Sequence, residues 1–351
     1  MKEQYVLITG GAGFIGTNVA RSYLEKNLPV HIFDNLGRAG VERNVSELQA
    51  AFPGMVRFTA ADVRDANAVL SAVENASAIY HLAAQVAVTT SLEDPMDDLE
   101  TNLIGTLNVL EAMRKLRTDA SLLFTSTNKV YGRLSSVEIC ERGSRHQPVD
   151  DALARSGVSE RQPLEFLSPY GCSKGSADQY VLDYAHSFGL RCCVFRMSCI
   201  YGRYQLGSED QGWVAHFLRQ ALKREPITIY GDGKQVRDLL FVDDLVRAMH
   251  LAHASMDRIA GTVFNMGGGP RNSTSLLDLL DQIASLTGGR VRTEWGPERL
   301  ADQRWFVADT ARAHELLGWT PVIGIKEGLN KLYDWYQSRP ALIEQVAAEV
   351  A

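Results

Sequence analysis

The sequence predicts an α/β fold with a doubly wound parallel sheet and a smaller, interleaved α/β lobe. Three observations predict it. An apolar, β-branched run at residues 5–8 leads into regularly placed glycines and then into a segment of helical periodicity. Strand-like and helix-like segments then alternate through the first half of the chain. After about residue 202 this alternation stops, which indicates a second lobe that the chain enters more than once.

The first turn has the glycine spacing of a dinucleotide-binding loop. In "YVLITGGAGFIG", Gly10 permits a tight turn, Gly13 lets the backbone approach a pyrophosphate, and Gly16 lets the next helix lie close to the strand. The N-terminus of that helix offers N–H donors and positive potential to phosphates. The alternative is a strand–helix turn that binds nothing. The motif predicts a Rossmann sheet, with ligands at the carboxyl ends of its strands.

The second strand ends in a residue suited to NAD. "VHIFD" ends at Asp34, 24 residues after Gly10. A carboxylate there accepts hydrogen bonds from ribose hydroxyls and repels a 2′-phosphate, which favours NAD over NADP. Arg38 and Arg43 follow in the next loop and would weaken this preference.

Three more strands complete the expected sheet, at residues 56–58, 78–82 and 121–127. Asp62 follows the first of them and is placed to contact the adenine amino group. Ala83 and Ala84 follow the second, where a dinucleotide would cross the sheet, and their small side chains leave room for it. We therefore expect residues 1–202, with about 235–266, to bind NAD, and residues 203–234 and 267–340 to form the substrate-binding lobe.

The last of these strands and a later helix carry the candidate catalytic side chains. Thr127 ends the strand, and "SPYGCSKG" places Tyr170 and Lys174 four residues apart on one helix face. A phenol titrates near 10, but a neighbouring ammonium and an oxidised nicotinamide both favour the phenolate. Thr127 would then donate to the substrate oxygen, and Lys174 would bind the nicotinamide ribose. The alternative is an ordinary surface pair.

Composition narrows the classes of protein. The chain has 351 residues, 45% of them hydrophobic, which suits two lobes with a substantial core. The net charge of -6 disfavours a nucleic-acid partner, and the sequence has no apolar run long enough for a membrane span. The five cysteines lack metal-binding spacing, so we expect no metal site, and their odd number argues against a disulfide framework and for the cytoplasm. The start of the chain is expected to be a strand and not a signal peptide.

Longer motifs resemble the extended short-chain dehydrogenase/reductases that act on nucleotide sugars. The resemblance covers nearly the whole chain, through "TGGAGFIG", "HLAAQ", "TNLIGTLNVLEA", "TSTNKVYG", "SPYGCSKG" and "GDGKQVRDLLFVDDL". It implies bound NAD, a nucleotide-diphosphate sugar as substrate, and a homodimer or homotetramer joined by the helices that begin near Asp97 and Tyr170. The catalytic set implied is Thr127, Tyr170 and Lys174.

With the motifs above, the resemblance assigns a set of cofactor contacts at the ends of the first four strands and in the catalytic helix. They are Gly10, Gly13, Phe14, Ile15, Gly16, Asp34, Asn35, Asp62, Val63, Leu82, Ala83, Ala84, Gln85, Tyr170 and Lys174. Asn102 is either a polar support for the active-site helices or a buried hydrogen bond between helices.

Within this family, the stretches "DNLGRAG", "STNKVYG", "DQGWVAHF" and "ADQRWFVAD" resemble enzymes that invert C2 of a CDP-linked sugar. Related 4,6-dehydratases carry Asp-Glu directly after the threonine, whereas this chain carries Asn128-Lys129. An amide cannot do the acid–base work of water elimination, so a redox epimerase is favoured. The alternatives are a UDP-hexose 4-epimerase or a related redox enzyme, and, more remotely, a non-catalytic NAD-binding regulatory protein. The sequence does not identify the base, and C2 in preference to C4 rests on the resemblance alone.

The substrate lobe contributes cations for a pyrophosphate. We expect Arg237 and Arg304 to bind it, with Arg299 behind them, because guanidinium groups suit phosphate oxygens. Arg237 could instead pair internally with Asp238. The other expected substrate contacts are Thr89, Asn128, Lys129 and Gln211. Lys129 either steadies a keto oxygen or is a solvated loop residue.

Further features of this lobe are expected from local patterns. Helices are expected near residues 212–224, 276–286 and 328–338, the second capped by a residue among Asn272, Ser273 and Thr274. Trp213 either frames the base or packs in the core. Residues 133–167 read as a lid or an interface arm, and Cys172 and His146 as packing or loop residues.

Overall fold

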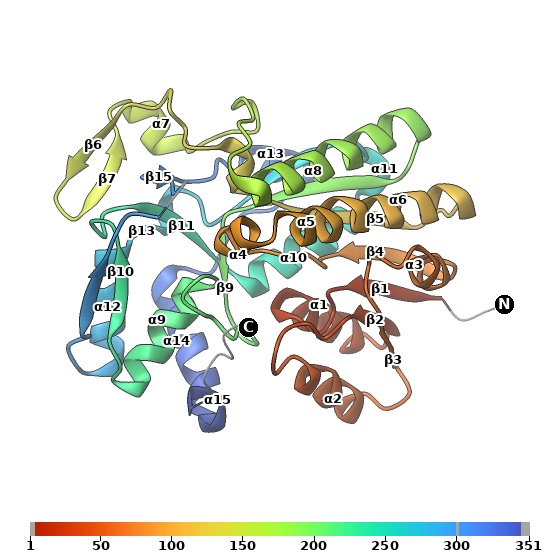
Figure 1. Cartoon of the computed structure of the whole chain (residues 1–351), viewed down its shortest axis with the longest axis horizontal. Coiled ribbons are helices and arrows are strands. Elements are labelled where there is room, and N and C mark those ends of the chain that lie inside the picture. Colours follow the sequence, from red (N-terminus) through yellow and green to blue (C-terminus); the bar gives the residue numbers. More distant parts are fainter. Residues whose placement is uncertain (1–3, 300–301, 345–351) are drawn as a thin grey trace.

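The computed structural model describes residues 4–299 and 302–344 (Figure 1). A seven-stranded sheet occupies one end of the molecule, with the strand order β12-β8-β5-β4-β1-β2-β3 and parallel pairing throughout. Its strands are β1 (Tyr5–Thr9), β2 (Val30–Asp34), β3 (Val56–Ala60), β4 (Ala76–His81), β5 (Ser121–Thr127), β8 (Cys192–Met197) and β12 (Val263–Met266). From β1 the chain adds β2 and β3 on one side of the sheet and then β4, β5, β8 and β12 on the other. This change of direction between β1 and β4 places a crevice at the carboxyl ends of these strands. The predicted α/β fold and its doubly wound parallel sheet are confirmed.

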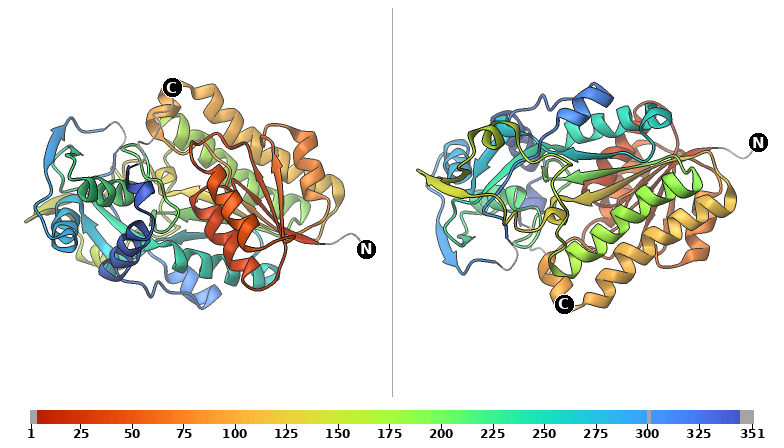
Figure 2. Two further views of the ribbon diagram at one scale, coloured as in Figure 1. Left: turned by 90° about the horizontal axis from the view of Figure 1, so that it is seen from below. Right: turned by 90° about the horizontal axis from the view of Figure 1, so that it is seen from above.

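Helices cover both faces of this sheet, as the opposite views in Figure 2 show. One face is covered by α1 (Phe14–Leu24), α2 (Glu42–Ala51) and α10 (Val242–Ala254), and the other by α3 (Ala66–Val73), α6 (Gly105–Leu116) and α8 (Ser168–Phe188). Each face has its own core. Ile8, Ile32 and Leu245 belong to the first, and Leu7, Phe124 and Val181 to the second. Adjacent strand residues such as Leu7 and Ile8 are both fully buried, as expected for a parallel sheet covered on two sides.

Short helical segments lie between β4 and α6. They are α4 (Val88–Glu93), α5 (Pro95–Leu99) and the π-helical segment η1 (Glu100–Ile104). All three contact α8. The 3-10 segment η2 (Asn128–Tyr131) directly follows β5.

Smaller sheets form the other end of the molecule. β11 (Val236–Phe241) pairs with β9 (Cys199–Tyr201), β13 (Ser273–Ser275) and β15 (Trp305–Phe306), and β10 (Ile227–Tyr230) pairs with β14 (Thr293–Gly296). The helices here are α9 (Trp213–Lys223), α12 (Leu276–Thr287), α14 (Ile325–Gln337) and α15 (Pro340–Glu344). Two short helices, α11 (Met256–Ile259) and α13 (Ala311–Leu317), lie beside β8 and β12 of the large sheet. The 3-10 segment η3 (Pro270–Asn272) precedes β13.

The stretch 133–167 contains a hairpin, β6 (Ile139–Arg142) and β7 (Arg145–Pro148), followed by α7 (Asp151–Ser156). The hairpin projects over the smaller sheets (Figure 1). His146 donates its backbone N–H to the carbonyl of Lys234, and Arg145 donates to the carbonyl of Ser273. The arm is therefore attached to the second lobe near the tip of its hairpin.

The five strands predicted in the first half are all present, with ends that differ by up to two residues. One helix cap was predicted wrongly. Ser275, and none of the three residues before it, caps α12 by accepting a hydrogen bond from the backbone N–H of Asp278. β13 extends to Ser275 through its pairing with β11, so the helix begins only at Leu276, and local sequence does not reveal this tertiary pairing. Among the described residues, no helix has the length and apolar character to cross a membrane.

Candidate active site

A cleft of about 560 Å³ lies at the carboxyl ends of the large sheet. Every predicted cofactor contact and all three predicted catalytic residues line it, although they come from segments up to 164 residues apart. Gln211 lines it too. The other predicted substrate contacts lie elsewhere: Arg299 and Arg304 line a second cavity, and Asn128, Lys129 and Arg237 lie near the junction of the lobes. Thr89 is near the cleft, and its hydroxyl oxygen has no hydrogen-bond partner among the described residues.

The glycine loop has the backbone shape that its sequence requires. Gly10 has a φ of 67°, and a Cβ there would come within 2.7 Å of the backbone nitrogen of Ala83. A Cβ at Gly16 would collide with the carbonyl of Gly10. Gly13 is the N-cap of α1 and supplies no side-chain cap, so the first N–H groups of the helix are left for a ligand.

The ends of β2 and β3 carry the predicted adenosine contacts. Asp34 accepts hydrogen bonds from the backbone N–H groups of Ala12 at 3.0 Å and Leu36 at 2.8 Å, so its carboxylate is held within the cleft. Burial raises its pKa, while those two bonds and the charge of Arg38 oppose the rise. Asp62 pairs with Arg64, whose hydrogen bonds hold the pKa of Asp62 at about 2. Asp62 is thus a fixed anion at the adenine end of the cleft.

The three candidate catalytic residues are all buried: Thr127 at the end of β5, and Tyr170 and Lys174 in the first turns of α8. Burial raises the pKa of Tyr170 to about 12, and a hydrogen bond with Thr127 acts in the opposite direction. Burial also lowers the pKa of Lys174 to about 7, although the negative charges of Asp178 and Asp98 act to raise it. The ammonium lies over the ring of Phe124, 4.2 Å from its centroid.

Within the chain, a hydrogen bond with Thr127 and the charge of Arg38 lower the pKa of Tyr170. The effect expected of Lys174 on Tyr170 stays a prediction, because desolvation dominates the pKa of both groups. A positively charged nicotinamide is the remaining influence that would favour the phenolate.

A buried carboxylate that the sequence analysis missed lies behind the catalytic helix. Asp98 accepts hydrogen bonds from Ser173 Oγ at 2.5 Å and from Asn102 Nδ2 at 3.0 Å. Asn102 also reaches Ser173 and the carbonyl of Gln85. Asn102 lies in the π-helical segment η1, and it forms the buried bond between helices while supporting the cleft. No sequence signal distinguishes Asp98 from the exposed acids beside it.

The residues after Thr127 are tied to the second lobe. Lys129 Nζ lies 3.3 Å from Asp302 Oδ1, and Arg237 Nη2 lies 2.7 Å from the same oxygen. Asn128 donates from Nδ2 to Gln303 Oε1 at 3.0 Å. The expected alternative for Arg237, an ion pair with Asp238, is wrong, because Asp238 instead accepts hydrogen bonds from Ser198 and from the backbone N–H of Gly269. Lys129 is a partly buried member of this cluster, and burial lowers its pKa.

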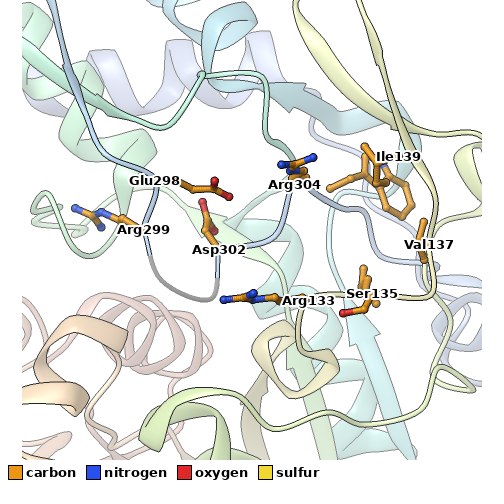
Figure 3. A pocket seen from close by; sticks show the side chains of 10 residues that line it. Arg133, Ser135, Val137, Ile139, Glu298, Arg299, Asp302 and Arg304 are labelled. Carbon is orange, nitrogen blue, oxygen red and sulfur yellow. The ribbon is translucent and has the colours of Figure 1, made fainter.

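The second cavity, of about 550 Å³, lies between the 133–139 segment and the loop before β15 (Figure 3). Three guanidinium groups line it, Arg133, Arg299 and Arg304, and Figure 3 shows Glu298 and Asp302 pointing toward one another within it. Arg299 also pairs with Asp210 at 3.2 Å and lies over the ring of Tyr230. Arg133 is a cation that the sequence analysis did not select. The opposite wall is apolar and consists of Leu134, Val137, Ile139 and Trp305.

Other predicted features have ordinary roles. All five cysteines are free thiols. Trp213 packs on Phe217, lines the cleft and donates to Cys199 Sγ at 3.4 Å, so it takes part in the packing, while its contact with a base stays a prediction. Glu141, His146 and Asp232 lie close enough together to hold a metal ion, but Lys234 already pairs with Glu141, and the group lies between the hairpin arm and the β10–β11 turn, outside the cleft.

The cleft fits NAD. It offers unoccupied helix N–H groups beside glycines for a pyrophosphate and a fixed carboxylate at Asp34 for ribose hydroxyls. Ser126, which also lines it, has a buried hydroxyl oxygen with no partner among the described residues. Lys174 and Tyr170 lie at the opposite end, where a nicotinamide ribose would lie.

Comparison with known proteins agrees with this geometry. Residues 6–267 match the model of the family described as "NAD dependent epimerase/dehydratase family". CDP-paratose 2-epimerase from Salmonella typhi is 41% identical over 340 residues, covering 95% of this chain and 99% of that protein. The crystal structure of UDP-glucose 4-epimerase from Thermus thermophilus in complex with NAD superposes with a TM-score of 0.80 at 31% identity, covering 96% of this chain and all of that one. The dTDP-glucose 4,6-dehydratase of Streptomyces venezuelae with NAD bound superposes with a TM-score of 0.83 at 26% identity, covering 97% of this chain and 99% of that one.

Proposed function

The chain belongs to the NAD-dependent epimerase/dehydratase family and uses NAD, and on this premise we propose that it inverts C2 of a CDP-linked sugar, interconverting CDP-paratose and CDP-tyvelose. The identity of 41% to a CDP-paratose 2-epimerase over almost the whole of both chains supports this substrate. Glycines 10, 13 and 16 with Asp34 would hold the dinucleotide, and Thr127, Tyr170 and Lys174 would act at its nicotinamide end.

One observation carries the choice of epimerase over dehydratase. The two residues after Thr127 are an amide and an ammonium, and both are committed to partners in the second lobe, Asn128 to Gln303 and Lys129 to Asp302. Water elimination needs an acid that protonates the leaving hydroxyl and a base that removes a carbon-bound proton. An amide cannot do either. Epimerisation by oxidation and reduction needs neither.

The chemistry divides between cofactor and protein. When bound, NAD would supply the hydride acceptor for oxidising the sugar carbon and the hydride donor for reducing it from the opposite face. Tyr170 would take the proton of the reacting hydroxyl in the first half-reaction and return it in the second. Lys174 binds the nicotinamide ribose and Thr127 holds the reacting oxygen beside Tyr170. Arg237, Arg299 and Arg304 would bind the pyrophosphate with charge-assisted hydrogen bonds, and Arg133 would join them from the arm.

The oligomer and the division of lobes are part of the proposal. Met96 on α5 is 61% exposed, and Leu92, Leu99, Ile104 and Tyr180 are also exposed on the helices beside it. An apolar surface of this kind suits a twofold contact with a second copy, as a homodimer or as half of a homotetramer. We keep residues 1–202 with about 235–266 as the NAD-binding domain, and residues 203–234 and 267–340 as the substrate lobe.

A second candidate is a UDP-hexose 4-epimerase. The similarity in fold and sequence to the NAD complex of a UDP-glucose 4-epimerase favours it. The two activities differ in which hydroxyl lies between Tyr170 and the nicotinamide, and C2 and C4 stereochemistry therefore separate them.

The experiment incubates the purified protein with CDP-paratose, UDP-glucose, and GDP- and dTDP-hexoses in deuterated water, and follows C2 and C4 by NMR. We expect inversion at C2 of the CDP-sugar alone, without deuterium at C2, because the hydride returns from the cofactor. The Tyr170→Phe variant should bind NAD and lose at least about 100-fold in turnover. Inversion at C4 of UDP-glucose would establish the second candidate. Bound NAD without conversion of any sugar would support a non-catalytic protein.

A further inference from the structure

A chain of three side chains, joined by two hydrogen bonds, connects the second lobe to Thr127. It begins at Gln303, which is 1% exposed and comes directly before the turn into β15. Gln303 Nε2 donates to the carbonyl of Gly132 at 2.6 Å and faces the carbonyl of Asn128 at 3.5 Å. Gln303 Oε1 accepts from Asn128 Nδ2 at 3.0 Å. Asn128 Oδ1 lies 3.4 Å from Thr127 Oγ1.

The direction of this chain is determined by its far end. A backbone carbonyl only accepts, so the two carbonyls that face Gln303 require its NH₂ group on that side. The oxygen of Gln303 must then face Asn128, which in turn must present its own NH₂ group to Gln303. The amide oxygen of Asn128 is left for Thr127, and it can only accept. The Thr127 proton is therefore directed at Asn128.

Because its proton is directed at Asn128, the Thr127 hydroxyl oxygen can only accept a hydrogen bond from a group in the cleft. This oxygen already accepts from the backbone N–H of Lys129 at 3.2 Å, and one lone pair remains for Tyr170, which lines the same cleft and whose pKa Thr127 lowers. A protonated phenol can donate to that lone pair. A phenolate instead needs the Thr127 proton, which must first turn away from Asn128. The bond of 3.4 Å is long and weak, so this rotation is cheap.

We propose that Gln303 is a positioning residue for the reaction: acting through Asn128, it directs the Thr127 hydroxyl proton away from Tyr170. The Thr127 proton is then shared between Asn128 and the phenolate, so the phenolate is stabilised less and takes up the sugar proton more readily. From its sequence motif, Thr127 is expected only to donate to the substrate. This inference depends on the proposed function, because it assigns Tyr170 as the base.

A structural role must be separated from this one, because Gln303 also ties the two lobes together. If Gln303 acts through Thr127, its removal should have no effect once the Thr127 hydroxyl is gone. If it only holds the lobes, the two losses should multiply. The variants are Gln303→Met and Thr127→Val, which keep the size of each side chain, and the double variant.

We expect Gln303→Met to lower kcat above the acid limb about twofold without a matching change in KM, because the bond that is lost is weak, and the double variant to equal Thr127→Val. The freed Thr127 hydroxyl should donate to the phenolate, so the acid limb of the pH profile should move down by about 0.3 pH unit, the counterpart of a twofold weaker base. The charged groups that face Tyr170 are Asp98 on α5, Arg38 after β2 and Lys174 on its own helix, and none of them is altered.

The matched control is Gln235→Met. Gln235 donates from Nε2 to the carbonyl of Tyr230 at 2.7 Å directly before β11 and has no hydrogen bond to Thr127, so its loss should leave the pH profile unchanged. If Gln303→Met does not fold, Asn128→Leu breaks the same chain one bond nearer to Thr127 and should also be silent in the Thr127→Val background. Multiplying losses in the double variant, or an unmoved acid limb, would overturn the inference.

A readout without turnover separates this inference from the proposed function. Ultraviolet difference titration of tyrosinate in the holoenzyme, with Tyr170→Phe as the reference, reports the Tyr170 pKa directly. A downward shift in Gln303→Met with no sugar epimerised would support the hydrogen-bond chain and reject the epimerase. Sugar epimerisation with no shift would do the opposite.

Discussion

Replacing the buried lysine of the active site should stabilise the protein, and the gain should depend on pH. Lys174 is 3% exposed, and burial lowers its pKa from 10.5 to about 7. This fall corresponds to about 5 kcal/mol, at about 1.4 kcal/mol for each tenfold change in proton affinity. Lys174→Met keeps the length of the side chain and removes the charge, so it should remove most of this cost.

The direction of this pH dependence follows from how many protons the folded and the unfolded chain bind. Between pH 7 and pH 10.5 the unfolded chain keeps the lysine proton and the folded chain releases it, so the wild type gains stability as the pH rises. The advantage of Lys174→Met should therefore be greatest below pH 7, approaching about 5 kcal/mol, and smaller by about 2–3 kcal/mol at pH 9. Other titrating groups are the same in both proteins and cancel in the difference.

The assay is denaturant unfolding of the wild type and Lys174→Met at pH 6, 7, 8 and 9, with one fixed NAD concentration. Lys331→Met is the matched control, because Lys331 is a half-exposed lysine on α14 whose partner is Glu327. The control should give a difference near zero at every pH. A Lys174→Met difference that stays constant from pH 6 to pH 9, or grows, would show that Lys174 keeps an ordinary pKa and would refute the reasoning.

Three further outcomes are expected. Asp178→Ala should lower the free energy of unfolding by about 3–5 kcal/mol, because it leaves Arg196 buried without its carboxylate; Asp257→Ala, which removes an exposed partner of another arginine, should change it by less than about 1 kcal/mol in the same melts. Gly16→Ala should abolish NAD binding measured by calorimetry, since its Cβ would force α1 away from the glycine loop, and unchanged binding would contradict this packing. Asp34→Ser should weaken NAD about tenfold and bring NADP to similar affinity, since the ribose loses a charged acceptor and a 2′-phosphate loses its repulsion; an unaltered preference would show that Asp34 does not face the ribose.

The catalytic set shows which properties of the site could be predicted from the sequence. Thr127, Tyr170 and Lys174 each belong to a local motif, and the motifs were sufficient to predict that they line one cleft with the glycine loop. Their protonation behaviour was not predictable in the same way. Lys174 was expected to lower the pKa of Tyr170, but desolvation dominates both groups, and desolvation depends on atoms brought in from Phe124, Asp98 and other distant positions.

The partners of the residues after Thr127 show the same limit. Asn128 and Lys129 were singled out by their position, but Gln303 and Asp302 lie 175 and 173 residues away along the chain. The cap of α12 was missed for a related reason, since β13 pairs with the distant β11 as far as Ser275 and the helix begins only after it.

By itself the sequence determined the α/β class, the strand–glycine–helix turn, the preference for NAD and the identity of the candidate catalytic side chains. Each of these depends on short-range periodicity or on the chemistry of a few adjacent residues. Only the tertiary structure decided which charges are neutralised, which protons are held weakly and in which direction the Thr127 hydroxyl points. Those properties arise from burial and from hydrogen bonds between the lobes, which no local pattern encodes.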